Sequence, residues 1–510
     1  KMKAGIKRMI SVFLMSAMLL SAAQTARADE EIPDRETERA ASYETAPDTN
    51  SIEGWPQGPQ VYGNSAIVMD MNSGAILYAK KADEQRYPAS ITKLMTALVA
   101  LENASLEDEV YFSEDSVSFL EYGDAHIGMT PGEILSMNDA LYGMLLASAN
   151  EVSYAIAESV GKSLGGGFDT FIQKMNDRAE EIGCTGSHWM NANGLHDEQH
   201  YTTAHDMAVI ASKVYQFEEF RTVVQTLQYT IGPTNQVGES RTFQQNHKML
   251  WPQNDNYYEY CTGGKTGYTD QARTTLVTMA DDGNLQLAAV VLRDYGNDAY
   301  IDTRAMFDYA FANFTKVFLK DQKKAEGISS YEDEEAYIVL PSGADFSSVQ
   351  AEVTITDKTK AAGTVAYTYQ GQNVGSASVT LTEEYIKEKT GYNITPEITG
   401  SGAGSDNADG NKEGLSLAAK IVIGITAGVI LFFVLVYAYL RYRLAMRRKR
   451  RMMRARRRRQ AQTRYQKYDT RAKRNPDGNA GVYRSFDRRP SGGYAPGQRP
   501  QARRPQSRRS

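Results

Sequence analysis

Three short segments, in a fixed order, constrain this chain more than the rest of its 510 residues. They read Ser90-Ile91-Thr92-Lys93, Ser148-Ala149-Asn150 and Lys265-Thr266-Gly267. In the first, a hydroxyl and an amine lie three residues apart, which places them on one face of a helix. If burial and neighbouring cations lower the pKa of this amine, it can take the hydroxyl proton. The other two segments add hydroxyls, a carboxamide and a second cation, a set of groups that suits serine acyl transfer.

The flanking sequence makes these segments more specific. Together they resemble the penicillin-recognising serine enzymes, whose motifs are S-x-x-K, S-x-N and K-T-G. The stretches NANGLHDEQHYTTAHDMAVIA, QQNHKMLW and GKTGYTDQA narrow the resemblance to the low-molecular-mass D-alanyl-D-alanine carboxypeptidases. The similarity runs from Trp55 to Phe318 and continues more weakly to Thr382. The chain departs from the family at Ala272-Arg273, where Ala-Gly is common, and this puts the local strand packing in question.

The resemblance implies catalytic roles for three side chains. Ser90 would attack the carbonyl of the penultimate D-Ala of a peptidoglycan stem pentapeptide and release the last D-Ala, and water would then hydrolyse the acyl-enzyme. Lys93 is the candidate base, and Ser148 would pass the proton to the leaving amine. Penicillins would acylate the same serine. The resemblance implies neither a cofactor nor a metal.

Five further residues are implied in substrate binding. The Asn150 amide would hydrogen-bond the substrate backbone, while Lys265 and Thr266 would bind the terminal carboxylate. Gly267 would keep the strand edge clear. The backbone N–H of Tyr268, with that of the nucleophile, would form an oxyanion hole.

The pattern of apolar residues predicts an α+β fold, and the resemblance implies that this fold is of the β-lactamase/transpeptidase type. Strands are expected at both ends of residues 55–320, with a mostly helical stretch over 97–161 between them. We therefore expect one antiparallel sheet whose first and last strands pair, with a helical lobe alongside and the site between the two. Residues 330–395 read as short strands joined by glycine turns, a small all-β domain that we interpret as a spacer or docking module.

Charge is divided sharply along the chain. Residues 441–510 hold 25 basic and 3 acidic residues, which leaves 32 of the 57 basic and 59 of the 62 acidic residues in 1–440. Between the two lies an uncharged apolar stretch of twenty residues, 421–440, long enough to cross a hydrocarbon core of about 30 Å as a helix. The basic side is expected in the cytoplasm and the acidic body outside, in a single-pass cell-membrane protein. A buried core helix is the alternative for this stretch.

The first residues agree with export. Basic residues precede an apolar run at 9–23 and an Ala26-Arg27-Ala28 sequence, which predicts a signal peptide over 1–28, although an uncleaved anchor is an alternative. The remaining predicted segments are a flexible leader (29–54), a linker (396–414), a transmembrane helix (415–440) and a disordered basic tail (441–510). For the tail, binding to anionic lipid is favoured over a cytoplasmic protein partner, and no nucleic acid is expected.

Other residues leave alternatives open. Cys184 and Cys261 are the only cysteines, and either unpaired thiols or a bridge fits an exported chain. His247 either lines the carboxylate pocket or is a partly buried polar residue. The spacing of three more histidines is weakly reminiscent of metal ligands, but the sequence around them does not predict the helix that zinc motifs use: His196, His200 and His205.

Two rival functions share the motifs. A β-lactamase would form the same acyl-enzyme, but no E-x-x-L-N-type segment follows Ser148 to position a deacylating water. A slow penicillin-binding sensor would pass a signal inward through the β-rich domain and the tail. A single membrane helix makes such conformational signalling difficult, so the carboxypeptidase is the leading hypothesis.

Overall fold

An antiparallel sheet of five strands organises the computed structural model, which describes residues 35–393. The strand order is β2-β1-β9-β8-β7, so the first strand of the chain pairs with a late one: Val68 on β1 lies opposite Ala289 on β9. This confirms the predicted pairing of the first and last strands. The strands are β1 (Ser65–Asp70), β2 (Ile76–Lys80), β7 (Cys261–Thr269), β8 (Arg273–Asp281) and β9 (Gln286–Asp294). Because β7 is last in the order, one of its edges carries no further strand of this sheet.

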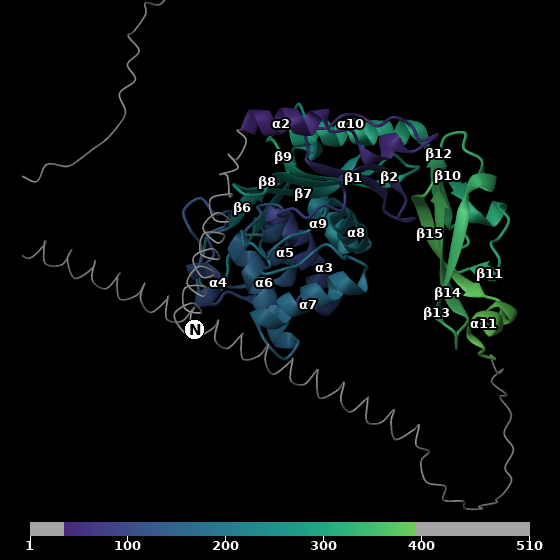
Figure 1. Ribbon diagram of the computed structural model, residues 1–510. Helices are drawn as coiled ribbons and strands as arrows, with labels where there is room; N and C mark the ends of the chain where they lie inside the picture. The colour runs from purple at the N-terminus through teal and green to yellow at the C-terminus, as the bar shows by residue number, and fades with distance from the viewer. Residues whose placement is uncertain (1–34, 394–510) are drawn as a thin grey trace, which may run out of the picture. The chain divides into compact units, whose positions relative to one another are not determined.

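The sheet is covered on both faces. Helices α10 (Asp298–Asn313) and α2 (Arg35–Glu44) lie over one face, and the helical lobe lies over the other (Figure 1). Side chains alternate accordingly along the central strands: Val277 and Val290 belong to the core on the lobe side, whereas Val291 belongs to the core under α10. Burial on both faces explains why these strands are nearly continuous apolar runs.

The helical lobe supplies most of the α content. Its helices are α3 (Lys93–Asn103), α4 (Glu114–Ser118), α5 (Met137–Leu145), α6 (Asn150–Ser163), α7 (Phe168–Glu181), α8 (Ala204–Val214) and α9 (Glu218–Gln225). The stretch predicted as mostly helical also holds a short ribbon, in which β3 (Glu109–Tyr111) pairs with β4 (Ile134–Ser136). A second ribbon pairs β5 (Gln228–Ile231) with β6 (Arg241–Gln244). Three- and four-residue strands give too few alternations for the sequence pattern to reveal them.

The C-terminal part of the described chain is rich in strands. A four-stranded sheet has the order β11-β15-β14-β13, and a ribbon joins β10 to β12. The strands are β10 (Phe314–Phe318), β11 (Ile328–Tyr331), β12 (Tyr337–Pro341), β13 (Gln350–Asp357), β14 (Ala362–Tyr369) and β15 (Gln372–Leu381), and helix α11 (Glu383–Thr390) follows. The helix makes this part β-rich rather than all-β.

The β-rich part does not have a core of its own. One cluster of buried side chains runs from Trp55 and Phe314 to Val374 and Leu381. The Tyr337 hydroxyl donates to Asp70 on β1 (3.1 Å), and the backbone N–H of Ser376 donates to the carbonyl of Ser73 (2.8 Å). A separate all-β domain over 330–395 is therefore not confirmed.

The prediction of a flexible leader over 29–54 is wrong for its described portion. Residues 35–44 form helix α2, and 48–51 form a 3₁₀ turn. Arg39 pairs with Asp298 at 2.5 Å, Glu38 pairs with Arg293, and the buried Lys80 donates to the carbonyl of Ser42 at 2.7 Å. These partners are distant in sequence, so local composition gave no sign of them.

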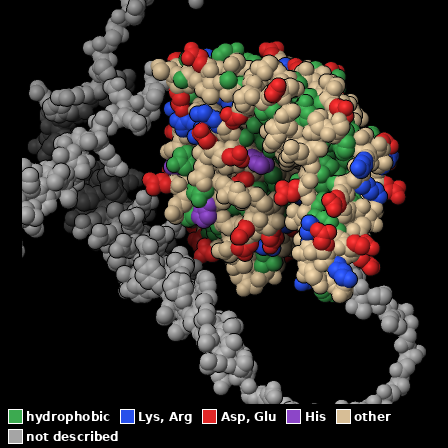
Figure 2. All heavy atoms as spheres, turned by 45° about the vertical axis from the view of Figure 1, so that its right-hand side comes forward, with side chains coloured by type: hydrophobic (Ala, Val, Ile, Leu, Met, Phe, Trp, Pro, Cys, Tyr) green, Lys and Arg blue, Asp and Glu red, His purple; other side chains and the backbone are tan. Residues whose placement is uncertain are grey.

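Several predictions fall on residues outside 35–393. They are the signal peptide (1–28), the linker (396–414), the transmembrane helix (415–440) and the basic tail (441–510). Among the residues that the structure describes, no helix is long and apolar enough to cross a membrane. Acidic side chains are spread over the face shown in Figure 2 and are interspersed with fewer basic ones.

Candidate active site

Ser90 lies in a tight turn that leads from the sheet into the lobe. The 3₁₀ turn η2 (Ala89–Thr92) runs directly into α3, and Ala89 has a φ of 52°, in the left-handed region. A hydrogen bond fixes the position of this turn: the Thr275 hydroxyl on β8 donates to the Pro88 carbonyl at 2.8 Å. A side chain at Gly194 would lie only 1.9 Å from the carbonyl oxygen of Ala89, so only glycine fits there. These contacts hold Ser90 half-buried beside the sheet.

Lys93 is buried directly behind the serine. Its Nζ lies 2.9 Å from Ser90 Oγ, 2.8 Å from Asn150 Oδ1 and 2.6 Å from the Asn193 carbonyl oxygen. Burial, and after it the positive charge of Lys265, hold the Lys93 pKa well below its ordinary value. The lowered pKa favours the uncharged amine, which in that form can accept the hydroxyl proton of Ser90.

The second segment joins two helices of the lobe. Ser148 lies between α5 and α6 with a φ of 63°, and Asn150 is the first residue of α6. Ser148 Oγ accepts from Lys265 Nζ at 3.0 Å, while Asn150 reaches Lys93. The second segment therefore links Lys93 of the first segment to Lys265 of the third through hydrogen bonds.

The third segment lies on β7, the edge strand that faces Ser90. Lys265 is buried, and its Nζ also donates to the carbonyl of Thr266 at 2.7 Å. Burial lowers the Lys265 pKa to about 7. A side chain at Gly267 would lie 2.9 Å from the backbone nitrogen of Ser90, so a bulkier residue would obstruct the space between strand and serine. Tyr268 is exposed next to it.

The structure therefore brings all eight predicted site residues together, but it also shows contributors that the sequence did not reveal. Asn193 acts through its backbone carbonyl, which leaves no side-chain signature, although NANGLH was part of the resemblance. Glu151, next to Asn150, is buried and accepts from the backbone N–H of Ile127 at 2.8 Å, which fixes the loop beside Ser148. Its burial raises its pKa.

The histidines and cysteines have other surroundings. His247 is buried, and its Nε2 lies 2.9 Å from Thr278 Oγ1. Burial lowers its pKa to about 3. Of the two interpretations of this residue, the structure fits a buried polar side chain. His200 bonds Thr92 at 2.8 Å. Both cysteines are free thiols, which excludes a bridge in this structure; burial raises the pKa of both, that of Cys261 to about 12.

The other two histidines with metal-like spacing make unrelated contacts. His205 pairs with Asp83 at 3.0 Å, and the ring of His196 packs edge-on against Tyr87. Within residues 35–393, no group of three or more His, Cys, Asp or Glu side chains is arranged to hold a metal ion.

Comparison with known proteins agrees with this geometry. Residues 53–296 match the family model described as D-alanyl-D-alanine carboxypeptidase. Over these residues the chain is similar to this family. D-alanyl-D-alanine carboxypeptidase DacF of Bacillus subtilis is 27% identical over 411 residues, which cover 75% of this chain and 95% of the relative. The Escherichia coli carboxypeptidase DacD is 27% identical over 326 residues, covering 59% of this chain and 79% of the relative.

A solved structure extends the likeness to the fold. Penicillin binding protein 5 of Haemophilus influenzae superposes with a TM-score of 0.50 at 24% identity, covering 64% of this chain and 98% of that one. The α+β fold is thus that of the penicillin-binding proteins. At the point where this chain departs from the carboxypeptidase family, Arg273 has a φ of 58°, a conformation that glycine adopts without strain. Its buried Nε has no hydrogen-bond partner among residues 35–393.

Proposed function

We propose that this protein is a serine D-alanyl-D-alanine carboxypeptidase that removes the terminal D-Ala from peptidoglycan stem pentapeptides. The observation that carries the proposal is the buried Lys93 amine, 2.9 Å from Ser90 Oγ and with a pKa well below its ordinary value. A base of this kind activates a serine without a histidine. The match of residues 53–296 to the carboxypeptidase family supports the same activity.

The acylation step follows from the contacts. Lys93 takes the proton of Ser90 as Oγ bonds to the carbonyl carbon of the penultimate D-Ala, and the oxygen becomes an anion held by backbone N–H groups of Ser90 and Tyr268. The C–N bond then breaks, and the proton passes through Ser148 to the leaving D-Ala amine. Neutral Lys93 is restored, and the acyl group remains on Ser90.

Binding selects a free carboxyl terminus. The Lys265 ammonium and the Thr266 hydroxyl would hold the terminal carboxylate through charge-assisted bonds. Asn150 would hydrogen-bond the substrate amide while it also orients Lys93. In the second step, water attacks the acyl carbonyl in the same oxyanion site, releases the shortened peptide and returns the proton to Ser90.

The test is product analysis. The purified ectodomain should release one D-Ala from a pentapeptide muropeptide, detected by mass, and Ser90→Ala should abolish both this release and covalent labelling by a fluorescent penicillin. Persistent labelling of the variant would remove Ser90 from the mechanism. Rapid turnover of penicillin without D-Ala release would point instead to the β-lactamase alternative.

We further propose that the enzyme works outside the cytoplasm and is held by the predicted transmembrane helix at 415–440. The support is sequence pattern alone: a secretory signal at one end, and an apolar stretch followed by about a dozen basic residues in 441–459 at the other. The substrate, which is part of the cell wall, lies on the same side of the membrane.

A further inference from the structure

A cavity of about 480 Å³ lies where the β-rich part meets the β1–β2 turn and helix α8. Its lining comes from that turn, from Lys213 in the last turn of α8, and from the β-rich part, chiefly β14, β15 and the segment between β11 and β12. No residue of the proposed active site lines it. Its volume falls within the range of about 300–1,000 Å³ that small-molecule sites occupy.

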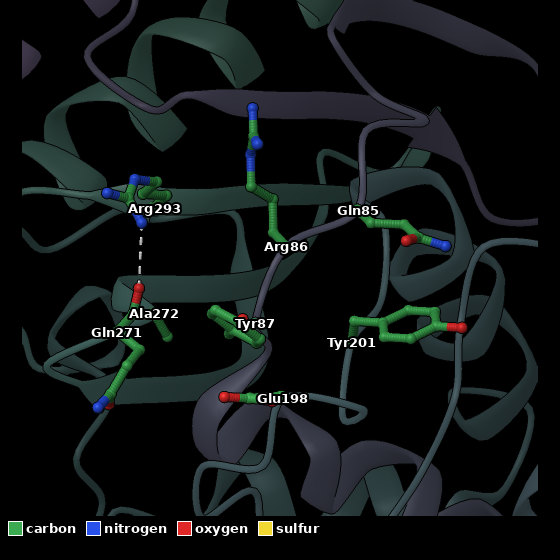
Figure 3. Close-up of a pocket in the computed structure, with 8 residues that line it drawn as sticks. All are labelled: Gln85, Arg86, Tyr87, Glu198, Tyr201, Gln271, Ala272 and Arg293. Atoms are coloured by element: carbon green, nitrogen blue, oxygen red, sulfur yellow. Dashed lines mark hydrogen bonds between the residues drawn. The ribbon is translucent and has the colours of Figure 1, made fainter. Parts of the chain in front are cut away.

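A smaller cavity, of about 260 Å³, lies beside the active site and belongs to the region already described. Its two guanidinium groups have partners. Arg86 pairs with Glu84. Arg293 pairs with Glu38 and donates to the Gln271 carbonyl at 3.1 Å (Figure 3). The larger cavity differs, because its charged groups are unpaired.

Hydrogen bonds hold the walls of the larger cavity in place. The Tyr337 hydroxyl donates to Asp70 at 3.1 Å and accepts from the Asn72 amide at 3.2 Å. The backbone N–H of Ser376 donates to the carbonyl of Ser73 at 2.8 Å. These bonds join the β1–β2 turn to β12 and β15, so the cavity is formed before a ligand binds.

One wall is a row of hydroxyl groups on the exposed face of the β-rich sheet. Thr364 on β14 lies directly opposite Ser378 on β15. Ser376 lies on the same face, because side chains alternate along a strand. All three residues are exposed, and neither Thr364 nor Ser378 makes a side-chain hydrogen bond with any residue of 35–393. Their hydroxyl groups are therefore available to a ligand.

The charged groups of the lining are available as well. Lys213 and Glu332 are exposed, and neither makes an ion pair or a side-chain hydrogen bond within the described part of the chain. Asp333 adds a second carboxylate, one oxygen of which accepts from the backbone N–H of Glu335 at 2.9 Å. The lining thus presents one ammonium group and two carboxylates beside the row of hydroxyl groups.

This set of groups suits a neutral ligand that is rich in hydroxyl groups. Carboxylates accept hydrogen bonds, an ammonium group donates them and hydroxyl groups do both, so all of them can bond to sugar hydroxyls or to acetamido groups. A polyanion would be repelled by Glu332 and Asp333. An apolar ligand would remove these carboxylates and Lys213 from water without replacing their hydrogen bonds.

We propose that this cavity binds a chain of N-acetylated sugars, the glycan that carries the stem peptides of peptidoglycan. Glu332 would accept from sugar hydroxyls, and Lys213 would donate to an acetamido carbonyl. The choice of this sugar chain rests on the proposed function, whereas the cavity and its unpaired groups do not depend on it. A second contact with the same polymer would raise the local concentration of stem peptides at Ser90.

The experiment measures the binding of chitotetraose, a peptide-free chain of four N-acetylglucosamine units, to the full chain in detergent by titration calorimetry. We expect saturable binding to the wild type. Ser378→Tyr should weaken it by about tenfold or more, because the ring would occupy the cavity, and an aromatic residue is well tolerated on an exposed strand face. Glu332→Gln should weaken it by about fivefold, since a charge-assisted hydrogen bond becomes a neutral one.

Each variant has a matched control. Thr354→Tyr places the same ring on an exposed position of β13, in the same sheet but outside the lining, and Glu107→Gln removes a negative charge from an exposed position of the lobe. Both should bind chitotetraose as the wild type does. Labelling by a fluorescent penicillin should persist in all four variants and shows that the active site is folded. If Ser378→Tyr is not labelled, the comparison of Glu332→Gln with Glu107→Gln decides.

The absence of chitotetraose binding in the wild type, or equal affinities in the cavity variants and their controls, would overturn the sugar site while D-Ala release stands. Binding of a sugar-free stem tetrapeptide that is lost in Ser378→Tyr, without any binding of chitotetraose, would make the cavity a peptide site and also overturn the inference. If chitotetraose binds as expected but no D-Ala is released by an enzyme that penicillin labels, the proposed function fails and the sugar site stands.

Discussion

At the residue scale, the site contains two buried lysines that need opposite protonation states. Lys93 must be neutral to act as a base, whereas Lys265 must be charged to bind a carboxylate. Both pKa values are lowered by burial, and the charge of Lys265 lowers that of Lys93 further. The arrangement requires that the amine next to Ser90 lose its proton more readily than the one next to Ser148.

This pairing predicts a pH profile. Lys265, with its pKa lowered to about 7, is charged below that pH, so kcat/KM for a peptide with a free carboxylate should fall as the pH rises above about 7. Lys93 acts in the opposite sense, and activity should fall at low pH as it becomes protonated. In Lys265→Arg the charge persists, so the alkaline limb should disappear, although the different geometry of arginine lowers the rate.

The control for this profile is a peptide with an amidated carboxyl terminus, which should react poorly and show no alkaline limb near pH 7. An alkaline limb that remains unchanged in Lys265→Arg would assign it to another group. Lys265→Ala should lower kcat/KM for the acid peptide by about 10²-fold and should cost the amide peptide much less.

Arg273 allows a test of backbone strain. A non-glycine residue in the left-handed region is strained by about 1–2 kcal/mol. Replacement by glycine removes this strain, but the greater entropy of glycine in the unfolded chain offsets part of the gain in stability. Arg273→Gly should therefore raise the free energy of unfolding by up to about 1 kcal/mol, measured by denaturant titration. Arg273→Ala removes the same side chain but keeps the strain. Equal stabilities of the two variants would show that the backbone conformation is not the cause.

At the element scale, helix α2 covers a buried ammonium group. Lys80 donates to the carbonyl and the hydroxyl of Ser42, as well as to the carbonyl of Val61. Burial lowers the Lys80 pKa to about 8. Without α2, two of these three acceptors are lost and the ammonium must be rehydrated.

A chain that begins at residue 47 should therefore be less stable than one that begins at residue 35, by about 2–4 kcal/mol. Lys80→Met should destabilise the longer chain but cost much less in the shorter one, where the acceptors are already absent. Denaturation of the four proteins gives the coupling energy. A coupling close to zero would mean that α2 stabilises the fold through its other contacts, such as its ion pairs with Asp298 and Arg293, and not through Ser42.

The same helix shows where prediction from sequence reached its limit. The motif residues could be found because their side chains carry the chemistry and lie at short spacings within each motif: Ser90, Lys93, Ser148 and Lys265. Helix α2 is stabilised by partners such as Arg293, more than 250 residues away, and a local pattern does not record such pairs. Asn193 contributes a carbonyl oxygen, which every residue possesses, so only the folded chain reveals it.

At the scale of the whole molecule, the sheet and the three motifs were predictable, but the relation between the catalytic and β-rich parts was not. A change of composition near residue 330 suggested a boundary. The buried cluster that joins Phe314 and Val374 shows that apolar packing crosses it. Composition reports local structure, whereas the extent of a core depends on which surfaces meet.

The proposed topology gives the last prediction. Every proposed site residue lies within 35–393, so a chain that ends at residue 398 should be secreted in soluble form and should bind fluorescent penicillin as the full chain does. A chain that ends at residue 459 keeps the apolar stretch and the first dozen basic residues, and it should remain in the membrane fraction, because about twenty apolar residues suffice to span a bilayer. Fractionation and labelling of the two chains separate anchoring from catalysis. If the shorter chain also stays in the membrane fraction, the anchor lies elsewhere, and an uncleaved amino-terminal segment becomes the better explanation.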